Sequence, residues 1–329
     1  MRRWLVWIGI AISFILVFVS LRALKLEEVW GALRGAQLAW VIPGIIAYFV
    51  AVLFRTFRWR HLLRPRKLVS VGELYRIIVI GYMGNNIYPA RIGELLRAYV
   101  LRRDEGVPIA YSIATVLIER IVDGLVMVAF VLIGLPRVPN LPAQAYNITY
   151  FAGALMAVAT LVFFWFALRP KMAERLAHAI LGKILPARLQ PPIFNFVSRF
   201  VEGAGSLRSP FDLAYIVGMS VIAWLIETVK YFFVMKAFAL DLPFVDLMLV
   251  NGVANLFTII PSGPGFVGTF DAAGIGVLSA LGVPSNIAGA YTLALHAVLW
   301  LPVTLVGAFF MLREGLHWND LQKAGDVKE

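Results

Sequence analysis

Six apolar runs in the sequence are long enough to cross the hydrocarbon core of a bilayer. A helix needs about 20 residues to span the ~30 Å of a typical core. Of the 329 residues, 60% are hydrophobic and only 15% are charged, whereas a soluble domain carries about 25% charged residues. The composition therefore predicts an all-α membrane protein. Its expected transmembrane helices are 4–22, 38–57, 108–134, 147–168, 213–238 and 287–312.

The first run follows Met1-Arg2-Arg3 and has the length of a signal-peptide core. The residues at its end, Val19-Ser20-Leu21-Arg22, offer no pair of small residues for cleavage. We therefore expect an uncleaved anchor helix followed by a linker, together covering 1–34. The chain has no cysteine, which excludes thiol catalysis, disulfides and cysteine-based metal sites.

Positive charge is distributed unevenly between the predicted loops. If the N-terminus is cytoplasmic and each run crosses once, the inside segments hold 20 Lys and Arg and the outside segments hold 4. This asymmetry obeys the positive-inside rule and predicts a cell (inner) membrane protein with both termini in the cytoplasm. The net charge of +11 then reflects loops that face anionic lipid, and we expect no nucleic-acid partner.

Two further apolar stretches, 71–104 and 245–281, are interrupted near their centres. The first breaks at Asn85-Asn86-Ile87-Tyr88-Pro89-Ala90 and continues from Arg91 as a polar helix. The second breaks at Pro261-Ser262-Gly263-Pro264-Gly265 and continues from Phe266 as a glycine-rich helix. Proline removes a backbone donor and glycine frees the turn. Because the charge distribution requires each stretch to return to the side it entered, both are predicted to be re-entrant helical hairpins, covered by protein or by a water-filled cavity.

The same order of elements recurs in both halves of the chain. Gly106-Val107-Pro108 follows the first hairpin and Gly282-Val283-Pro284 follows the second, 176 positions later. Residues 106–134 match 282–310 at seven of 29 positions without a gap. The first unit starts outside and the second inside, so they predict inverted-topology repeats, 35–134 and 211–313, whose broken helices indicate a binding site. A duplication that serves only stability is the alternative.

Charged residues occupy the predicted membrane segments, where each costs ~2.5–3.5 kcal/mol on insertion scales. Those of the first half surround the first break: Arg91, Glu94 and Arg97 after it, and Glu119, Arg120 and Asp123 in the third span. A helix N-terminus near residue 91 adds free backbone N–H groups, so this cluster predicts a site for phosphate or carboxylate. The alternative is mutual neutralisation that holds the helices in register.

The second half carries fewer charges. Glu227 and Lys230 lie within the fifth span, three positions apart, and a purely structural pairing accounts for them equally well. Asp271 follows the second break, and His296 lies within the last span, opposite Arg120 in the gapless comparison. For His296, a hydrogen-bonded packing role and a proton-carrying role both remain open.

Residues 171–208 mix Lys and Arg with apolar residues at helical spacing and contain Pro186 and Pro191-Pro192. They predict one or two amphipathic helices on the cytoplasmic surface. The chain therefore divides into an N-terminal anchor and linker, a membrane domain over 35–313, and a cytoplasmic tail over 314–329. Within the membrane domain, a span and the amphipathic segment (135–210) join the two repeats.

Three motifs occur in a fixed order: NNIYPARIGELLR at 85–97, Glu119-Arg120-x-x-Asp123, and PSGPGFVGTFD at 261–271. Together they resemble the flippase-like membrane domain of lysylphosphatidylglycerol synthases. That family often has Glu where this chain has Asp271, which keeps the charge. The resemblance implies movement of a phospholipid or another charged lipid between leaflets. The chain ends 17 residues after the last span, so we expect no synthase domain and no lysyl transfer.

We therefore predict a lipid flippase or scramblase, not an enzyme, whose partner is a membrane phospholipid or a polyprenyl lipid. Coupling to protons or to the membrane potential stays open. The expected substrate-binding residues are Asn86, Pro89, Arg91, Glu94, Arg97, Glu119, Arg120, Asp123, Gly263, Gly265, Gly268 and Asp271. Coupling or structural roles are expected for Glu227, Lys230 and His296.

Two other functions are compatible with this pattern. One is a membrane enzyme that acts on a polyprenyl phosphate or a lipid-linked sugar, as a phosphatase or glycosyltransferase. The other is a transporter of small solutes or ions, which would not need so many arginines. The sequence contains no P-loop, no metal-type His/Asp cluster and no G-x-S-x-G motif, so no cofactor or metal is expected. It indicates no oligomeric state.

Overall fold

The computed structural model describes residues 26–314, apart from 89–90, 140, 142, 168, 185, 187–189, 206, 208 and 261. Over these residues every regular element is a helix and there is no strand, which confirms the predicted all-α class. The predicted first span, 4–22, lies outside this part of the chain, as does the tail beyond Glu314.

Five long helices coincide with the second to sixth predicted spans. They are α3 (Val41–Leu63), α6 (Ile109–Gly134), α7 (Ala143–Ala167), α10 (Pro210–Ala237) and α13 (Ser285–Arg313). Three of them are long and apolar enough to cross a membrane: α10, α13, and α3 together with the preceding turn η1 (Leu38–Trp40). Helix α6 is equally long but contains three charged residues, and the apolar stretch of α7 is shorter, Thr149–Trp165. The count of six spans therefore stays a prediction.

Helix α3 extends farther than the sequence predicted. The expected span ended at residue 57, and Arg58 was assigned to a cytoplasmic loop, which is wrong. The helix continues to Leu63, and the Arg58 side chain is 1% exposed because it pairs with Glu119 and Asp123. Arg97, also counted as an inside charge, is likewise buried. The excess of positive charge on the inside persists without these two residues.

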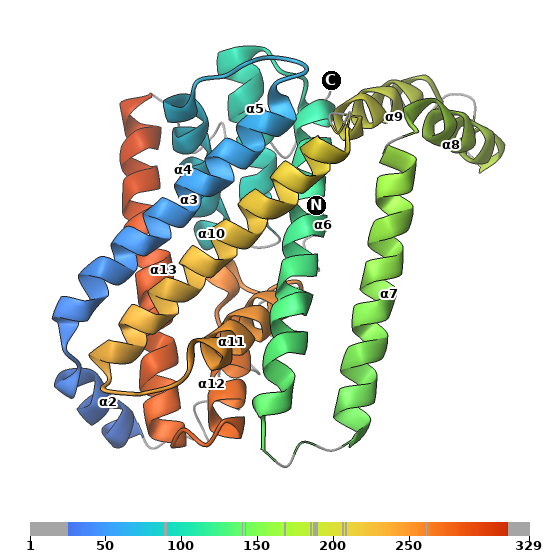
Figure 1. Ribbon diagram of the computed structural model, residues 1–329. Coiled ribbons are helices and arrows are strands. Elements are labelled where there is room, and N and C mark those ends of the chain that lie inside the picture. The colour runs from blue at the N-terminus through green and yellow to red at the C-terminus, as the bar shows by residue number, and fades with distance from the viewer. Residues whose placement is uncertain are drawn as a thin grey trace.

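Two pairs of short helices replace the interrupted stretches. The first pair is α4 (Val71–Ile87) and α5 (Ile92–Glu105), and the second is α11 (Phe244–Phe257) and α12 (Thr269–Ala280). The members of each pair pack against each other, and Figure 1 shows the pairs at opposite ends of the bundle. At 1.5 Å per residue, the 14-residue helices α5 and α11 are only about 21 Å long. None of the four would span a bilayer alone.

The helix of the second pair begins later than predicted. The sequence placed its start at Phe266, but Pro264–Phe266 forms a 3-10 turn, η4, and α12 starts at Thr269. Gly265 and Phe266 both have positive φ, 65° and 61°, so an α-helix cannot pass through them. Gly268 follows with φ 89°, and its N–H donates to the Asp271 carboxylate, which caps α12.

The two halves pack in the same way. Helix α3 runs alongside α10, α4 packs on α13, and α11 packs on α6 (Figure 1). A glycine permits close approach in both of the last two contacts. Gly307 of α13 lies against Val79 and Met83 of α4, and Gly134 of α6 lies against Leu249 of α11. Two large apolar clusters fill the bundle, one around α4 and α5 and the other around α11 and α12.

The Gly-Val-Pro markers also adopt the same conformation in both halves. Gly106 and Gly282 have positive φ, 70° and 91°, a conformation that glycine adopts without strain. Pro108 and Pro284 are the N-caps of α6 and α13, with φ of −57° and −54°. In each half the marker therefore turns the chain from a short helix into a long one.

The remaining helices lie at the periphery. Helix α2 (Leu26–Gly35) packs on α13 through Val29 and Ala290, and the turn η2 (Leu135–Arg137) follows α6. The predicted amphipathic segment forms two helices, α8 (Pro170–Ile184) and α9 (Gln190–Ala204), with Pro191-Pro192 in the first turn of α9. Both lie at the upper end of the bundle in Figure 1, and α9 packs on α6.

Candidate functional site

A cavity of about 130 Å³ lies between the two helix pairs and has several charged side chains in its wall. Four long helices contribute residues to it from near their midpoints: Arg55 of α3, Arg120 of α6, Trp224 of α10 and His296 of α13. The ends of α4 and α11 complete it with Asn86 and Thr258, and η4 contributes Gly265 and Phe266. A cavity lined in this way lies near the middle of the bundle.

The charge around this cavity is mostly positive. Among the described residues, the fully ionised side chains that line it are those of Arg55, Arg91, Arg120 and Glu227. Aromatic rings form much of the remaining wall, from Tyr48, Tyr82, Trp224, Phe266, Phe270 and Trp300. The Arg55 guanidinium lies 4.6 Å from the Trp224 ring centre and the Arg91 guanidinium 5.2 Å from that of Phe266, within the range of cation–π attraction.

Arg120 belongs to a continuous chain of ion pairs behind the cavity. Its Nη2 lies 3.1 Å from Asp123 Oδ2, and its Nε lies 3.8 Å from Glu94 Oε1. Asp123 also accepts hydrogen bonds from Arg58 and from the Trp224 indole. Arg58 continues the chain to Glu119, 3.3 Å away, and Glu119 pairs with Arg97 at 3.1 Å. Within this chain Arg58 and Arg120 each lie beside two carboxylates, and the buried Arg97 depends on Glu119.

Arg91 connects the two helix breaks. It is the N-cap of α5 with φ 55°, a left-handed conformation that strains a residue other than glycine. Its Nη2 donates to the Thr258 hydroxyl at 2.7 Å and to the Thr258 carbonyl at 3.3 Å, across to the end of α11. Its Nη1 lies 3.5 Å from Glu94. The two breaks thus lie against each other, as the sequence predicts.

The first turn of α5 is less open than expected. A Cβ added at Gly93 would lie 1.8 Å from the Gly81 carbonyl oxygen of α4, so this turn packs directly on α4. Of the first turn of α5, only Arg91 lines the cavity among the described residues. The helix N-terminus expected to meet a phosphate with its backbone N–H groups is therefore covered by α4 on the side of Gly93.

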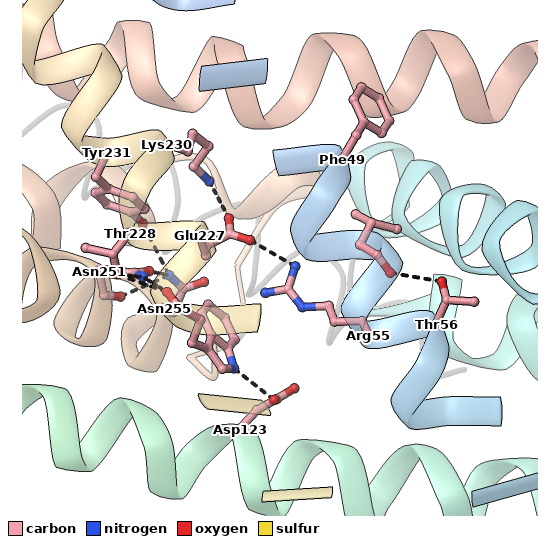
Figure 2. A network of polar contacts seen from close by, with 12 residues as sticks. Phe49, Arg55, Thr56, Asp123, Glu227, Thr228, Lys230, Tyr231, Asn251 and Asn255 are labelled. Atoms are coloured by element: carbon pink, nitrogen blue, oxygen red, sulfur yellow. Dashed lines mark hydrogen bonds and ion pairs between the residues drawn. The ribbon is translucent and has the colours of Figure 1, made fainter. Parts of the chain in front are cut away.

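Glu227 is held by two cations. Figure 2 shows its carboxylate between Arg55 and Lys230. Arg55 Nη1 donates to Glu227 Oε2 at 2.9 Å, and Lys230 Nζ donates to Oε1. All three side chains are buried. The predicted pairing of Glu227 with Lys230 is confirmed, and Arg55 is the third member of this group.

His296 contacts an acceptor on each side of its ring. Nδ1 lies 2.7 Å from Asp271 Oδ1, and Nε2 lies 2.9 Å from the Gly265 carbonyl oxygen. The His296 side chain lines the cavity, whereas Asp271 does not. The pair connects α13 to α12 and to the second break.

The structure gathers some of the predicted residues in the cavity wall and leaves others behind it. Those in the wall are Asn86, Arg91, Arg120, Gly265, Glu227 and His296. The others that the structure describes do not line the cavity: Glu94, Arg97, Glu119, Asp123, Lys230, Gly263, Gly268 and Asp271. Pro89, also predicted, lies outside the described residues.

Sequence reasoning missed Arg55 and Arg58. Arg55 lies near the end of the predicted second span, where an arginine ordinarily extends to the membrane interface, and Arg58 was assigned to the loop that follows. Their spacing gave one available signal, because Arg55 and Arg58 are three positions apart on the same helical face. In the structure Arg58 pairs with Glu119 and Asp123 of α6, and Arg55 pairs with Glu227 of α10.

Exposed apolar side chains flank the second break. Ile259 is 63% exposed, and Ile260 and Val267 are 39% and 43% exposed. Their sequence neighbours Thr258 and Phe266 line the cavity. A cationic cavity therefore adjoins an apolar outer surface at this break.

The comparisons with known proteins agree with a membrane protein. The family model described as lysylphosphatidylglycerol synthase TM region matches residues 6–307. A UPF0104 membrane protein of Methanothermobacter thermautotrophicus is 23% identical and aligns over 90% of this chain and 93% of its own length. The UPF0104 membrane protein PH1989 of Pyrococcus horikoshii is 24% identical over 92% of this chain and 96% of its own length.

A further relative is longer. Glycosyltransferase AglD of Haloferax volcanii is 24% identical over 93% of this chain, but the match covers only 54% of that protein. The chain therefore spans about half the length of this relative. No solved structure matches the chain.

Proposed function

Because the chain belongs to the family of the lysylphosphatidylglycerol synthase TM region, we propose that it moves a phospholipid or another charged lipid between the two leaflets of the membrane. The observation that carries this proposal is the cationic cavity at mid-bundle, bordered by exposed apolar side chains at the second break. Such a site suits a ligand whose charged headgroup enters protein while its tails stay in lipid.

The headgroup that fits best is an anionic one. Arg55, Arg91 and Arg120 outnumber the one ionised carboxylate in the wall, Glu227, among the residues described. Guanidinium groups bind phosphate through parallel hydrogen bonds. The volume of about 130 Å³ is below the ~300–1,000 Å³ of a typical small-molecule pocket, which favours part of a lipid over a whole solute.

The architecture that supports transport is a pair of inverted repeats. In this proposal α4–α5 and α11–α12 are re-entrant hairpins that enter from opposite faces and meet at the cavity. The equivalent packing of α4 on α13 and of α11 on α6 supports this relation, as do the matching Gly-Val-Pro turns. Inverted repeats with broken helices at the midplane permit alternating access when one repeat rocks against the other.

A second candidate is glycosyl or phosphoryl transfer on a polyprenyl phosphate, favoured by the name of the relative glycosyltransferase AglD. A general acid or base would have to be available for such chemistry. Two described groups of the cavity wall could take that role, and both are already engaged: Glu227 by Arg55 and Lys230, and His296 by Asp271 and the Gly265 carbonyl. We therefore prefer transport, and the experiment below separates the two.

The test is transbilayer movement of fluorescent phosphatidylglycerol in liposomes that contain the purified protein. The informative variant is Arg91→Gln, because Arg91 lines the cavity and is not part of the fully buried ion-pair chain. We expect it to lower the rate about tenfold, the effect of losing one charge-assisted contact worth ~1.4 kcal/mol. Arg103→Gln is the matched control, because Arg103 lies on the same helix, outside the cavity and partly exposed.

Three results would contradict the proposal. One is an unchanged distribution of the lipid across the bilayer with wild-type protein. Another is an equal loss with Arg91→Gln and Arg103→Gln, which would indicate a general effect of charge on α5. The third is conversion of the lipid into a new product by mass spectrometry, which would favour the enzyme.

A further inference from the structure

His296 lies between two hydrogen-bond acceptors, the Gly265 carbonyl and the Asp271 carboxylate. If the histidine is neutral and the aspartate is ionised, the three groups hold one proton too few for both hydrogen bonds. The Gly265 carbonyl can only accept, so His296 Nε2 must donate to it across 2.9 Å. Nδ1 lies 2.7 Å from Asp271 Oδ1. Since a neutral imidazole has one N–H, this second contact needs another proton, on Nδ1 or on the carboxyl group.

The surroundings keep that proton between these two residues. Asp271 Oδ2 already accepts the Gly268 N–H at 2.9 Å, which leaves Oδ1 to face the imidazole. The other carboxylates near the cavity each lie beside two cations. These are Arg55 and Lys230 for Glu227, Arg58 and Arg120 for Asp123, and Arg91 and Arg120 for Glu94. Because the groups beside these carboxylates are cations that already carry their protons, those contacts need no additional proton.

Matching positions in the two halves carry different kinds of cation. His296 corresponds to Arg120 in the gapless comparison of the two repeats, and Asp271 falls within one position of the residue that corresponds to Glu94. Arg120 lies 3.8 Å from Glu94, and His296 lies 2.7 Å from Asp271. An arginine stays charged at every working pH, whereas a histidine changes charge between about pH 5 and 8. The His296–Asp271 pair of the second repeat can therefore titrate, whereas the corresponding Arg120–Glu94 pair of the first repeat keeps its charge.

We propose that Asp271 and His296 form a proton-binding site that couples protonation of the protein to the movement of an anionic lipid. This inference rests on the proposed function. In the protonated state the imidazolium bonds to both acceptors and adds one positive charge to the cavity wall. On release, the proton leaves His296 for solvent, the imidazole becomes neutral, and the pair changes from no net charge to one negative charge.

Loss of the proton also changes the second break. A neutral His296 can donate to the Asp271 carboxylate or to the Gly265 carbonyl, but not to both. The charge-assisted bond to Asp271 is the stronger of the two, so the bond to Gly265 is lost. Gly265 packs against Trp300 and the Asn86 carbonyl at the first break, so its release loosens the contact between the two breaks. Protonation therefore favours both the closed contact and the anionic headgroup.

Other charged and titratable groups face this pair from the helices around α13. They are Tyr48 and Arg55 on α3, Tyr82 on α4, Arg91 at the start of α5, Arg120 on α6, and Glu227 and Lys230 on α10. Helix α2 meets α13 farther along, near Ala290. The tyrosines and arginines keep one protonation state between about pH 5 and 8, and Lys230 and Glu227 form an ion pair of their own. The proton is therefore assigned to the pair by the ring nitrogens of His296, which report on this residue alone.

The first test reads the protons directly. Protein labelled with ¹⁵N-histidine is placed in nanodiscs of phosphatidylethanolamine and phosphatidylglycerol, and the ring nitrogens are followed by NMR from about pH 5 to 8. The chain has four histidines, and His296→Gln assigns the signal. We expect both His296 nitrogens to be protonated at the acidic end and one N–H to be lost as pH rises. A His296 signal with a single N–H throughout, or with no change, would overturn the site.

The second test measures lipid movement. Fluorescent phosphatidylglycerol is followed in liposomes of the same two lipids at both ends of that pH range. We expect the wild-type rate to change by about tenfold or more, within the range of measured coupling between sites, and His296→Gln to be independent of pH. His61→Gln is the matched control, because His61 also faces a carboxylate, Asp212 at 2.8 Å, but lies outside the cavity. It should retain the wild-type dependence.

The outcomes separate this inference from the proposed function. Wild-type transport that ignores pH would reject the coupling and leave the transporter intact. Absence of lipid movement at every pH would reject the transporter, whatever the NMR shows. A pH dependence lost equally in His61→Gln and His296→Gln would also reject the assignment to this pair.

Discussion

The two helix breaks are built alike, but the cation at the first is an arginine and the cation at the second is a histidine. At the first break, Arg120 has a fixed charge and shares two carboxylates, Glu94 and Asp123. At the second, His296 has one carboxylate, Asp271, and a backbone carbonyl. Because a guanidinium cannot lose its proton in proteins, the first break is a permanent cationic surface. The second break can change its charge with pH, because His296 can gain or lose a proton. The comparison suggests that the first repeat binds the anionic headgroup and that the second regulates its movement.

The breaks also differ in how closely their helices approach. Gly84 and Gly93 bring α4 and α5 into backbone contact. The glycines of α11 and α12 face other helices instead: Gly252 lies against Met127 of α6, and Gly274 against Thr292 of α13. The sequence suggested that glycine serves mainly the second break. The structure shows that the closest approach within a pair occurs at the first.

The largest expected effect comes from removing a carboxylate at each break. Asp123→Ala leaves the buried Arg58 and the partly buried Arg120 with one partner fewer, and we expect it to cost about 3–5 kcal/mol in free energy of unfolding. Asp271→Ala should cost less, about 1–3 kcal/mol, because His296 can become neutral and Arg58 cannot. Unfolding in detergent, followed by circular dichroism, measures both values.

Asp241→Ala is the control for this comparison, because Asp241 forms an exposed ion pair with Lys236. It should change the free energy of unfolding by no more than about 1 kcal/mol. Equal losses for Asp123→Ala and Asp271→Ala would show that the two breaks are electrostatically equivalent and would remove the basis of the comparison.

A smaller effect is expected where the first pair packs most tightly. The Cβ of Gly93→Ala would lie 1.8 Å from the Gly81 carbonyl oxygen, so the backbones of α4 and α5 must separate. We expect a loss of about 1–3 kcal/mol in free energy of unfolding. In the second pair, a Cβ at Gly276 meets nothing within 4 Å. Gly276→Ala should therefore stabilise α12 by about 0.5–1 kcal/mol.

Thermal unfolding of the two alanine variants in the same detergent compares these packings directly. Destabilisation by both variants to the same degree would mean that tight glycine packing is not particular to the first pair.

Much of the fold follows from the sequence because its signals are long or repeated. Runs of about 20 apolar residues identify five of the long helices. The recurring Gly-Val-Pro turn relates α6 to α13, since each turn needs a positive φ that glycine supplies without strain. Both breaks were likewise predictable, because proline and asparagine interrupt apolar segments that are otherwise helical.

The site itself was only partly predictable, because burial of a charge depends on its partners. Arg97 and Arg91 fall on one predicted helix, yet Arg97 is buried beside Trp59 and Glu119 and Arg91 faces the cavity. Arg55 belongs to the wall because Glu227 stands opposite on a helix 172 positions away. No periodicity within a single helix contains that information.

The smallest expected effect tests the bridge between the two breaks. Thr258→Val keeps the shape of the side chain but removes the hydroxyl that accepts from Arg91 Nη2 at 2.7 Å. Arg91 retains the Thr258 carbonyl, Glu94 and the Phe266 ring, so we expect a loss of only about 0.5–1.5 kcal/mol in free energy of unfolding. Thr160→Val is the control, because the Thr160 hydroxyl bonds only within its own helix.

A double-mutant cycle then tells whether this contact joins the repeats. If Arg91 and Thr258 interact directly, the combination of Arg91→Gln with Thr258→Val should cost less than the sum of the single changes by about 0.5–1.5 kcal/mol. If the two free-energy changes are strictly additive, the contact between Arg91 and Thr258 contributes no stability to the packing of one break on the other. The fixed charge of the first break would then have no mechanical connection to the second through this residue, and the packing of Gly265 against the Asn86 carbonyl would be the more important connection between them.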